Sequence, residues 1–204
     1  MIPPRPPRHT AAAGATGRIA QVIVASTRAA AGEYQDRTGP VISAWLTERN
    51  WLVLARAVVA DGAPVGDALA AAVEAGLDLV ITTGGTGVSP TDQTPEQTLP
   101  LLDRQLPGIT EEMRRRGAAS TPFAVLSRGY AGIARGRTVV VNLPGTVGGV
   151  RDGLAVLDEV LDHLLDQLHG IDHAAQRPGT QPTRSTSAPA AHSPSSAEER
   201  RDDH

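Results

Sequence analysis

The sequence predicts an α/β protein: a single three-layer α/β/α domain with a mostly parallel sheet. Segments typical of strands and of helices alternate along most of the chain, which favours helices packed on both faces of one sheet. The stretches 79–82 (LVIT) and 138–141 (TVVV) are continuous runs rather than alternating patterns. Such runs indicate strands that are buried on both faces, as in a parallel sheet with right-handed crossovers.

In the first half of the domain, strands are expected to alternate with two helices. Apolar residues at helical spacing indicate the first helix, and an alanine-rich stretch that ends at Gly76 indicates the second. The predicted order is strand 18–25, loop 26–36, helix 38–49, strand 51–59, a turn at 61–62, helix 64–75 and strand 77–83.

The second half begins with a glycine turn and ends in the longest predicted helix, whose apolar residues line one face. Pro100 falls within the pattern of the helix that starts at Pro95, so a kink or a break is expected there. The later elements are a short helix over 108–116, a short strand or helix over 123–127, a strand over 137–142 and the long helix over 149–169.

The segment 79–98 (LVITTGGTGVSPTDQTPEQT) is the most informative part of the chain. It predicts a strand, a glycine turn, a lone carboxylate at Asp92 and a helix. Thr94 and Gln97 have the spacing of a capping box, and Pro95 is expected at the first helical position. Because ligands of α/β proteins bind at the carboxyl ends of the strands, this segment is the expected centre of a site.

The composition excludes several classes of chemistry. A net charge of −3 and five aromatic residues argue against binding to nucleic acid or to an anionic membrane. The chain has no cysteine, and all 19 basic residues are arginine, which excludes thiolate sites and lysine-dependent phosphate loops. No histidine lies between residues 10 and 162. Oxygen ligands and backbone amides remain, and these suit phosphate and magnesium.

The two ends of the chain are expected to lie outside the domain, which is predicted over 18–170. Residues 1–17 form a predicted flexible arm without the apolar region of a secretory signal. Residues 171–204 are rich in Pro, Ser, Ala and charge, which predicts a disordered tail. No apolar run is long enough to span a membrane, and a cytoplasmic location is expected.

Polar or glycine residues follow four of the predicted strands, so their loops are expected to converge on one rim of the sheet. Asp92 could close a local turn or hold magnesium, Asp61 could form a turn or join Asp92 on the rim, and the glycine turn could bend the chain or bind an anion. The other candidates are Ser26, Asp36, Gly84, Gly85, Thr86, Gly87, Asn142, Leu143, Pro144 and Gly145. The arginine run 114–116 and the histidines at 163, 169 and 173 are expected to be surface residues.

These motifs resemble those of the MogA/MoaB family of molybdenum-cofactor biosynthesis proteins, whose domain also occurs in gephyrin. The resemblance covers about residues 19–168. It rests on TTGGTG followed by Asp and TPE, NLPG before the last helix, STR…GEYQD and VVADGAP. TTGGTG alone would also admit the related MoeA and CinA domains, but the compact length favours MogA/MoaB.

The resemblance implies a magnesium-dependent molybdopterin adenylyltransferase that is a trimer, or in some members a hexamer. The terminal phosphate of molybdopterin attacks the α-phosphorus of ATP, pyrophosphate leaves, and a MoeA-type partner then inserts the metal. Asp61 and Asp92 correspond to the two carboxylates tied to catalysis and are the tentative magnesium ligands. The segments Thr83–Gly87 and Asn142–Gly145 correspond to nucleotide and pterin contacts.

Two residues depart from the family pattern. Thr27 stands where many members have Asp, and Thr91 stands where the family often has Arg before the second acid. These departures leave open a MoaB-like paralogue that binds molybdopterin without turnover. A CinA-like nucleotide pyrophosphatase is a further alternative.

Overall fold

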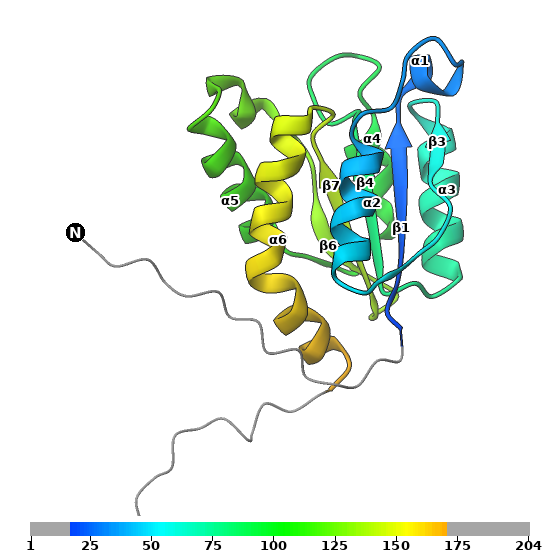
Figure 1. The fold of residues 1–204 in the computed structure, drawn as a ribbon, viewed down its shortest axis with the longest axis vertical. Coiled ribbons are helices and arrows are strands. Elements are labelled where there is room, and N and C mark those ends of the chain that lie inside the picture. Colours follow the sequence, from blue (N-terminus) through cyan, green and yellow to red (C-terminus); the bar gives the residue numbers. More distant parts are fainter. Residues whose placement is uncertain (1–16, 171–204) are drawn as a thin grey trace, which may run out of the picture. The chain divides into compact units, whose positions relative to one another are not determined.

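The computed structural model describes residues 17–170, which contain one seven-stranded sheet (Figure 1). The strands lie in the order β2-β1-β4-β7-β6-β5. The strand β3 pairs with the same edge of β1 as β2 does, but farther along β1. Only β6 runs antiparallel to its neighbours β5 and β7, so the sheet is mostly parallel, as predicted. The strands are β1 Ile19–Ala25, β2 Leu52–Val53, β3 Ala57–Val59, β4 Leu79–Thr83, β5 Arg104–Gln105, β6 Ala131–Ala134 and β7 Thr138–Leu143.

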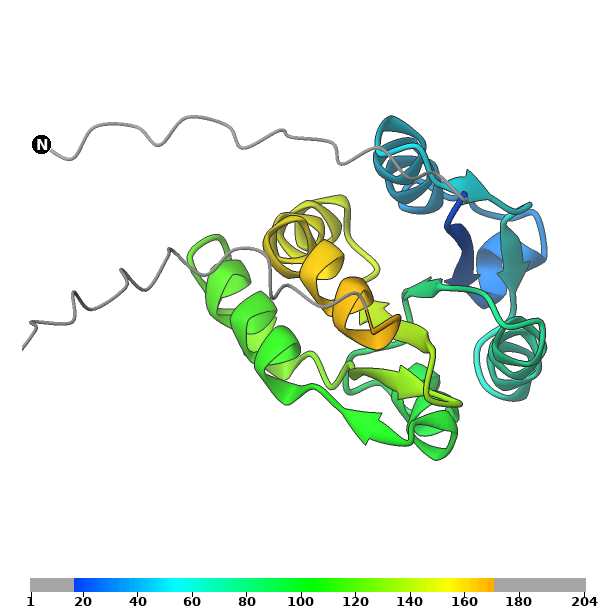
Figure 2. The same cartoon turned by 90° about the horizontal axis from the view of Figure 1, so that it is seen from below.

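Helices cover both faces of this sheet, which confirms the predicted three-layer α/β/α architecture (Figure 2). The core on one face joins α2, α5 and α6 to the sheet, and the core on the other face is centred on α3. The helices are α1 Thr27–Ala30, α2 Gly39–Glu48, α3 Ala63–Glu74, α4 Thr94–Thr98, α5 Pro107–Ala118 and α6 Val147–Leu168, with 3-10 turns η1 Leu99–Leu101 and η2 Pro122–Leu126.

Two groups of strands differ from the sequence prediction, whereas an expected helix break is confirmed. The segment 51–59 forms two short strands rather than one, because only its two ends pair with β1. The strands β5 and β6 were not predicted: β5 has two residues, and β6 (AGIA) has a single large apolar side chain. The break expected at Pro100 is present, since α4 ends at Thr98 and a 3-10 turn follows.

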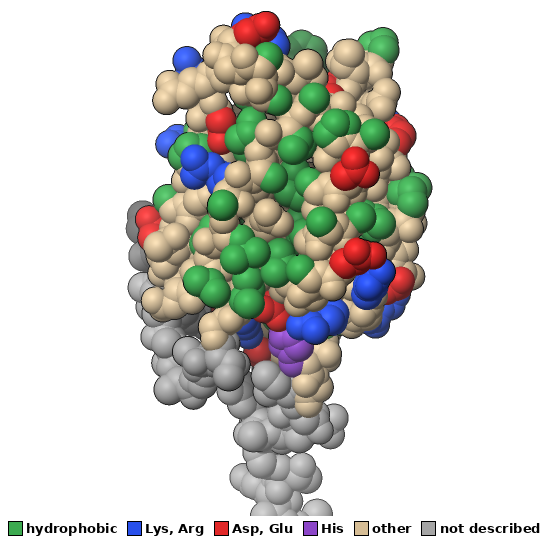
Figure 3. Space-filling view, turned by 90° about the vertical axis from the view of Figure 1, so that its right-hand side faces the viewer, with side chains coloured by type: hydrophobic (Ala, Val, Ile, Leu, Met, Phe, Trp, Pro, Cys, Tyr) green, Lys and Arg blue, Asp and Glu red, His purple; other side chains and the backbone are tan. Residues whose placement is uncertain are grey.

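The edge of the sheet formed by β2 and β3 carries exposed apolar side chains. Leu52, Leu54 and Val58 expose 56%, 39% and 38% of their surface. Figure 3 shows the face that carries β3 and α3, on which hydrophobic side chains gather in several places. Charged side chains commonly protect an edge strand, but β2 and β3 themselves contain none, and the charged residue of this edge is Arg56, which lies between them.

The predicted arm and tail lie outside the described residues, apart from Gly17 at the end of the arm. No helix within residues 17–170 is long and apolar enough to cross a membrane.

The arginine run 114–116 lies in the last turns of α5, and its three members have different surroundings. Arg115 is exposed and pairs with Glu112 one turn earlier. Arg116 pairs with the same carboxylate and with Glu159, which links α5 to α6. Arg114 donates to the carbonyl oxygen of Ser127 and to the hydroxyl of Thr110.

Glu112 is expected to stay ionised to unusually low pH. Hydrogen bonds from Arg115 and then Arg116 lower its pKa from an ordinary value of 4.5 to about 2. Because the pKa is lower in the folded state, the stabilisation is present above pH 4.5 and is lost as the pH falls through about 2. A carbon-13 NMR titration of the Glu112 carboxyl should give this midpoint. Arg115→Gln should raise it, and an unchanged midpoint in that variant would contradict the assignment.

Candidate functional site

The carboxyl ends of four parallel strands meet at one rim of the sheet. Ser26 follows β1, Asp61 follows β3 after one residue, Gly84 follows β4 and Pro144 follows β7. The strand pairings give the order β3-β1-β4-β7 across this rim. The strand β1 therefore stands between the strand that leads to Asp61 and the strand that leads to the glycine turn.

The glycine turn contains a row of backbone amides without a hydrogen-bond acceptor among the described residues. Gly84 and Gly85 have φ angles of 93° and 61°, which glycine adopts without the cost that other residues incur. A Cβ at Gly84 would collide with the carbonyl oxygen of Ala25. The N–H groups of residues 85–88 donate to no hydrogen bond within the described part of the chain. Consecutive unpaired N–H groups in such a turn form a concavity that favours anions.

Asp61 lies against the first part of this turn. A Cβ at Gly85 would lie 2.8 Å from Asp61 Oδ1. Asp61 Oδ2 accepts hydrogen bonds from the N–H and the hydroxyl of Thr27, at 3.0 and 2.9 Å. Among the described residues nothing donates to Oδ1. One oxygen is therefore fixed by the protein, and the other remains available for a ligand.

Asp92 lies against the far end of the same turn. A Cβ at Gly87 would lie 2.7 Å from Asp92 Oδ2. The same oxygen accepts the N–H of Ser89 at 3.2 Å, so Asp92 also closes a local turn. Its Oδ1 accepts no hydrogen bond from residues 17–170. The two carboxylates thus flank the segment 85–87, and each keeps one oxygen without a donor.

The predicted capping box at Thr94 and Gln97 is wrong. The residue that precedes α4 is Gln93, and its side chain makes no capping hydrogen bond. Thr94 is instead the first helical residue, and Pro95 is the second. Thr94 donates from its N–H to the Gly85 carbonyl oxygen and from its hydroxyl to the Gly84 carbonyl oxygen, both at 3.0 Å. It therefore holds the helix against the glycine turn.

The NLPG segment, Asn142–Gly145, is mostly buried beneath the rim and is only partly exposed on it. Asn142 and Leu143 are buried. The Asn142 amide nitrogen donates to the hydroxyls of Thr82 and Thr98, and its oxygen accepts the N–H of Tyr130, all at 2.9 Å. Only Gly145 is exposed, while Pro144 is partly buried. The Asn142 side chain is therefore fully occupied by protein groups.

Four further predicted contacts have structural surroundings. Ser26 Oγ accepts the N–H of Ala29 at 3.2 Å and so caps α1. Asp36 Oδ1 accepts N–H groups at the start of α2, and its Oδ2 lies 3.7 Å from Arg56 Nε. Thr83 and Thr86 are buried, and the hydroxyl of Thr83 donates to the Pro144 carbonyl oxygen at 2.8 Å. None of these four side chains is fully exposed at the rim.

Known proteins resemble this chain over most of the described region. The family model described as a probable molybdopterin binding domain matches residues 21–163. The chain belongs to the MogA/MoaB family of molybdopterin-binding domains. A molybdopterin biosynthesis Mog protein from Mycobacterium ulcerans has a solved structure with a TM-score of 0.71 and 56% identity, which covers 74% of this chain and 99% of that one.

Two relatives with assigned names support the same placement. A molybdopterin adenylyltransferase from Pyrococcus furiosus is 38% identical over 71% of this chain and 87% of its own length. A molybdenum cofactor biosynthesis bifunctional protein from Synechococcus elongatus is 40% identical over 77% of this chain. The chain spans 49% of that bifunctional relative, about half its length.

The two departures from the MogA/MoaB pattern fall beside the two carboxylates. Thr27 makes the two hydrogen bonds to Asp61 that are described above. Its hydroxyl is a neutral donor at the position where the family pattern has a carboxylate. Thr91 is exposed, and its hydroxyl lies 3.0 Å from the hydroxyl of Ser89, inside the turn that Asp92 closes. Both threonines therefore take part in local structure and leave the two carboxylates in place.

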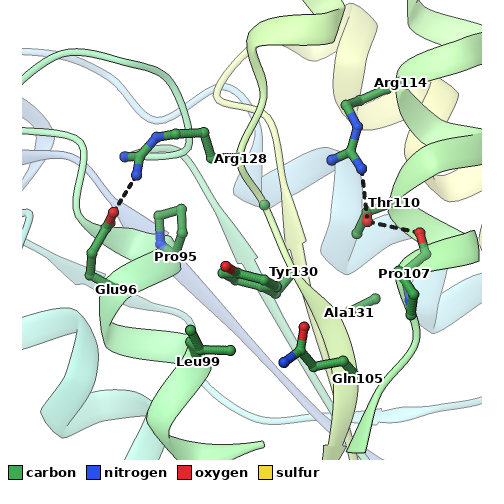
Figure 4. A pocket seen from close by; sticks show the side chains of 11 residues that line it. Pro95, Glu96, Leu99, Gln105, Pro107, Thr110, Arg114, Arg128, Tyr130 and Ala131 are labelled. Atoms are coloured by element: carbon green, nitrogen blue, oxygen red, sulfur yellow. Dashed lines mark hydrogen bonds and ion pairs between the residues drawn. The ribbon is translucent and has the colours of Figure 1, made fainter.

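Two adjoining clefts of this MogA/MoaB domain share Glu96 and Arg128, and Asp92 lines one of them. One, of about 550 Å³, is lined by Val88, Ser89, Pro90, Asp92, Gln93 and the shared pair. The other, of about 410 Å³, opens between α4 and α5 with Tyr130 in its centre (Figure 4). Sequence reasoning missed Arg128 because it lies in an irregular segment before β6, a strand that had itself not been predicted.

Proposed function

We propose that this protein transfers the adenylyl group of ATP to the terminal phosphate of molybdopterin. The observation that carries the proposal is the row of unpaired amides at residues 85–88, flanked by Asp61 and Asp92. This arrangement suits a chain of phosphates, because amides stabilise phosphate oxygens and the carboxylates can hold a cation. Relatives named molybdopterin adenylyltransferase support the same reaction.

In the proposed reaction, an oxygen of the molybdopterin phosphate forms a bond to the α-phosphorus of ATP. The bond from that phosphorus to the oxygen that bridges to the β-phosphate breaks, and pyrophosphate leaves. Phosphoryl-type transfer requires alignment and charge neutralisation rather than a covalent protein group. The amides of residues 85–88 would stabilise negative charge on the phosphate oxygens, and Asp61 and Asp92 would hold the cation that offsets the charge of the phosphates.

Magnesium fits the side chains at this rim. Asp61 and Asp92 would hold the ion, since the Oδ1 atom of each accepts no hydrogen bond from residues 17–170. Mg²⁺ is commonly held by one or two carboxylates together with substrate phosphates and water. Within residues 17–170, no three or more His, Cys, Asp or Glu side chains are grouped so that they could hold a metal ion by themselves. When bound, the ion would neutralise charge on the transferring phosphates.

We further propose that the protein acts in the cytoplasm as a homo-oligomer, with a trimer as the expected form. Its product would pass to a MoeA-type partner for metal insertion. These proposals rest on the family alone.

The proposed reaction can be tested with purified protein, ATP, magnesium and molybdopterin. We expect equal amounts of pyrophosphate and adenylylated molybdopterin, measured by a coupled phosphate assay and by mass spectrometry. Omitting molybdopterin should abolish pyrophosphate release. Molybdopterin binding without release would instead support a MoaB-like binding protein. Hydrolysis of ADP-ribose without any pterin would support a CinA-like pyrophosphatase.

A further inference from the structure

Arg128 is the main anchor of the turn that carries Asp92. Its N–H donates to the Thr86 carbonyl oxygen at 2.9 Å. Its guanidinium donates from Nε to the Gly87 carbonyl oxygen and from Nη2 to the Asp92 carbonyl oxygen, both at 2.7 Å. The remaining nitrogen, Nη1, pairs with Glu96 on α4. One residue therefore joins the beginning, the end and the following helix of the turn.

No other described residue outside the segment 86–92 makes a hydrogen bond with it. The remaining hydrogen bonds of the segment are internal and involve Ser89, Thr91 and Asp92. The segment follows two glycines with positive φ angles and contains a third glycine, so its own backbone restrains it weakly. The position of Asp92 relative to the rest of the rim therefore depends on bonds from Arg128.

The guanidinium of Arg128 is held mainly by protein acceptors. All three of its nitrogens have protein partners, and Glu96 offsets its charge. A planar guanidinium can reach three acceptors in different directions, whereas the ammonium of lysine is a point charge without that geometry. The side chain is 37% exposed, so water can replace the bonds that it makes to backbone carbonyls.

We propose that Arg128 is a positioning residue, which sets the Asp92 carboxylate and the amides of residues 85–88 in the geometry that adenylyl transfer requires. The kinetic part of this inference rests on the proposed function. The structural part, the anchoring of the turn, does not depend on it.

Arg128→Ala is expected to lower kcat about 10- to 100-fold, since small misplacements of reacting groups cost rates of this size. KM for ATP should change much less, because Gly84 and Gly85, which begin the glycine turn, are held by Leu143 and Thr94 and not by Arg128. Hydrogen exchange of the amides of residues 86–92 should become faster, while the thermal unfolding temperature should stay near that of the wild type.

Added methylguanidinium should restore part of the kcat that Arg128→Ala loses. Arg128→Lys should recover less than half of the lost activity, because it can replace only part of the contacts.

Arg115→Ala provides a matched control. Arg115 also pairs with a glutamate through its guanidinium, but it is an exposed residue of α5 that makes no bond to the turn. This variant should keep the wild-type kcat and the wild-type exchange of residues 86–92.

Three results would overturn the inference: Arg128→Ala within about twofold of wild-type kcat, unchanged exchange of residues 86–92, or a loss of activity matched by global unfolding. If the wild type itself shows no adenylyl transfer, the proposed function fails. The hydrogen-exchange measurement alone then tests whether Arg128 anchors the turn. Faster exchange confined to the turn would then support the anchor, and unchanged exchange would exclude it.

Discussion

Asp92→Asn is expected to lower kcat for adenylyl transfer by about 10²- to 10³-fold, which corresponds to roughly 3–4 kcal/mol of lost transition-state stabilisation. The substitution keeps an oxygen that can accept the Ser89 N–H, so the local turn should remain intact. It removes the negative charge that a magnesium ion would require. Single-turnover formation of adenylylated molybdopterin at saturating magnesium measures the effect directly.

Asp61→Asn should behave in the same way, because an amide oxygen can still accept the bonds from Thr27. Asp67→Asn is the matched control, since Asp67 is an exposed carboxylate on α3, a few residues beyond Asp61. All three variants should unfold at temperatures close to that of the wild type. If both rim variants kept the wild-type rate, the assignment of these carboxylates to the site would be wrong.

Much of the fold follows from local sequence patterns. Both central strands, β4 and β7, are continuous apolar runs and are completely buried, as the patterns predict. The short strands β5 and β6 could not be predicted, because their pairing (β5 with β6, and β6 with β7) rather than their own composition makes them strands. The split of the segment 51–59 has a similar origin, since it depends on where β1 offers partners.

The candidate site could be predicted only in part. Asp61, Asp92 and the glycine turn lie together because each follows a parallel strand, and parallel strands end at a common rim. Motif position did not reveal which way the side chains would point. Asn142 is part of a recognisable motif, but it is a strand residue that faces the interior. Arg128 lacked any local signal, because its role comes from contacts with a turn about 40 residues earlier.

Asn142→Leu is expected to destabilise the fold by about 3–5 kcal/mol. The change removes three hydrogen bonds worth roughly 1 kcal/mol each and leaves the N–H of Tyr130 without its acceptor, which adds up to about 2 kcal/mol because that N–H is only partly buried. Leucine is apolar and of similar size, so the loss reflects polar pairing rather than a cavity. Thermal unfolding should show a fall of roughly 10 °C for a domain of this size.

Thr98→Val separates this structural role from substrate contact. It removes one of the three partners of Asn142 and the bond from Thr98 to the Thr94 carbonyl oxygen, so it should cost about 1–2 kcal/mol. Measured below their unfolding temperatures, both variants should bind molybdopterin with an affinity near that of the wild type. A direct ligand contact predicts the reverse for Asn142→Leu: weakened binding with little loss of stability. That result would show that Asn142 contacts the substrate directly. The end of β7 would then have to open when substrate binds.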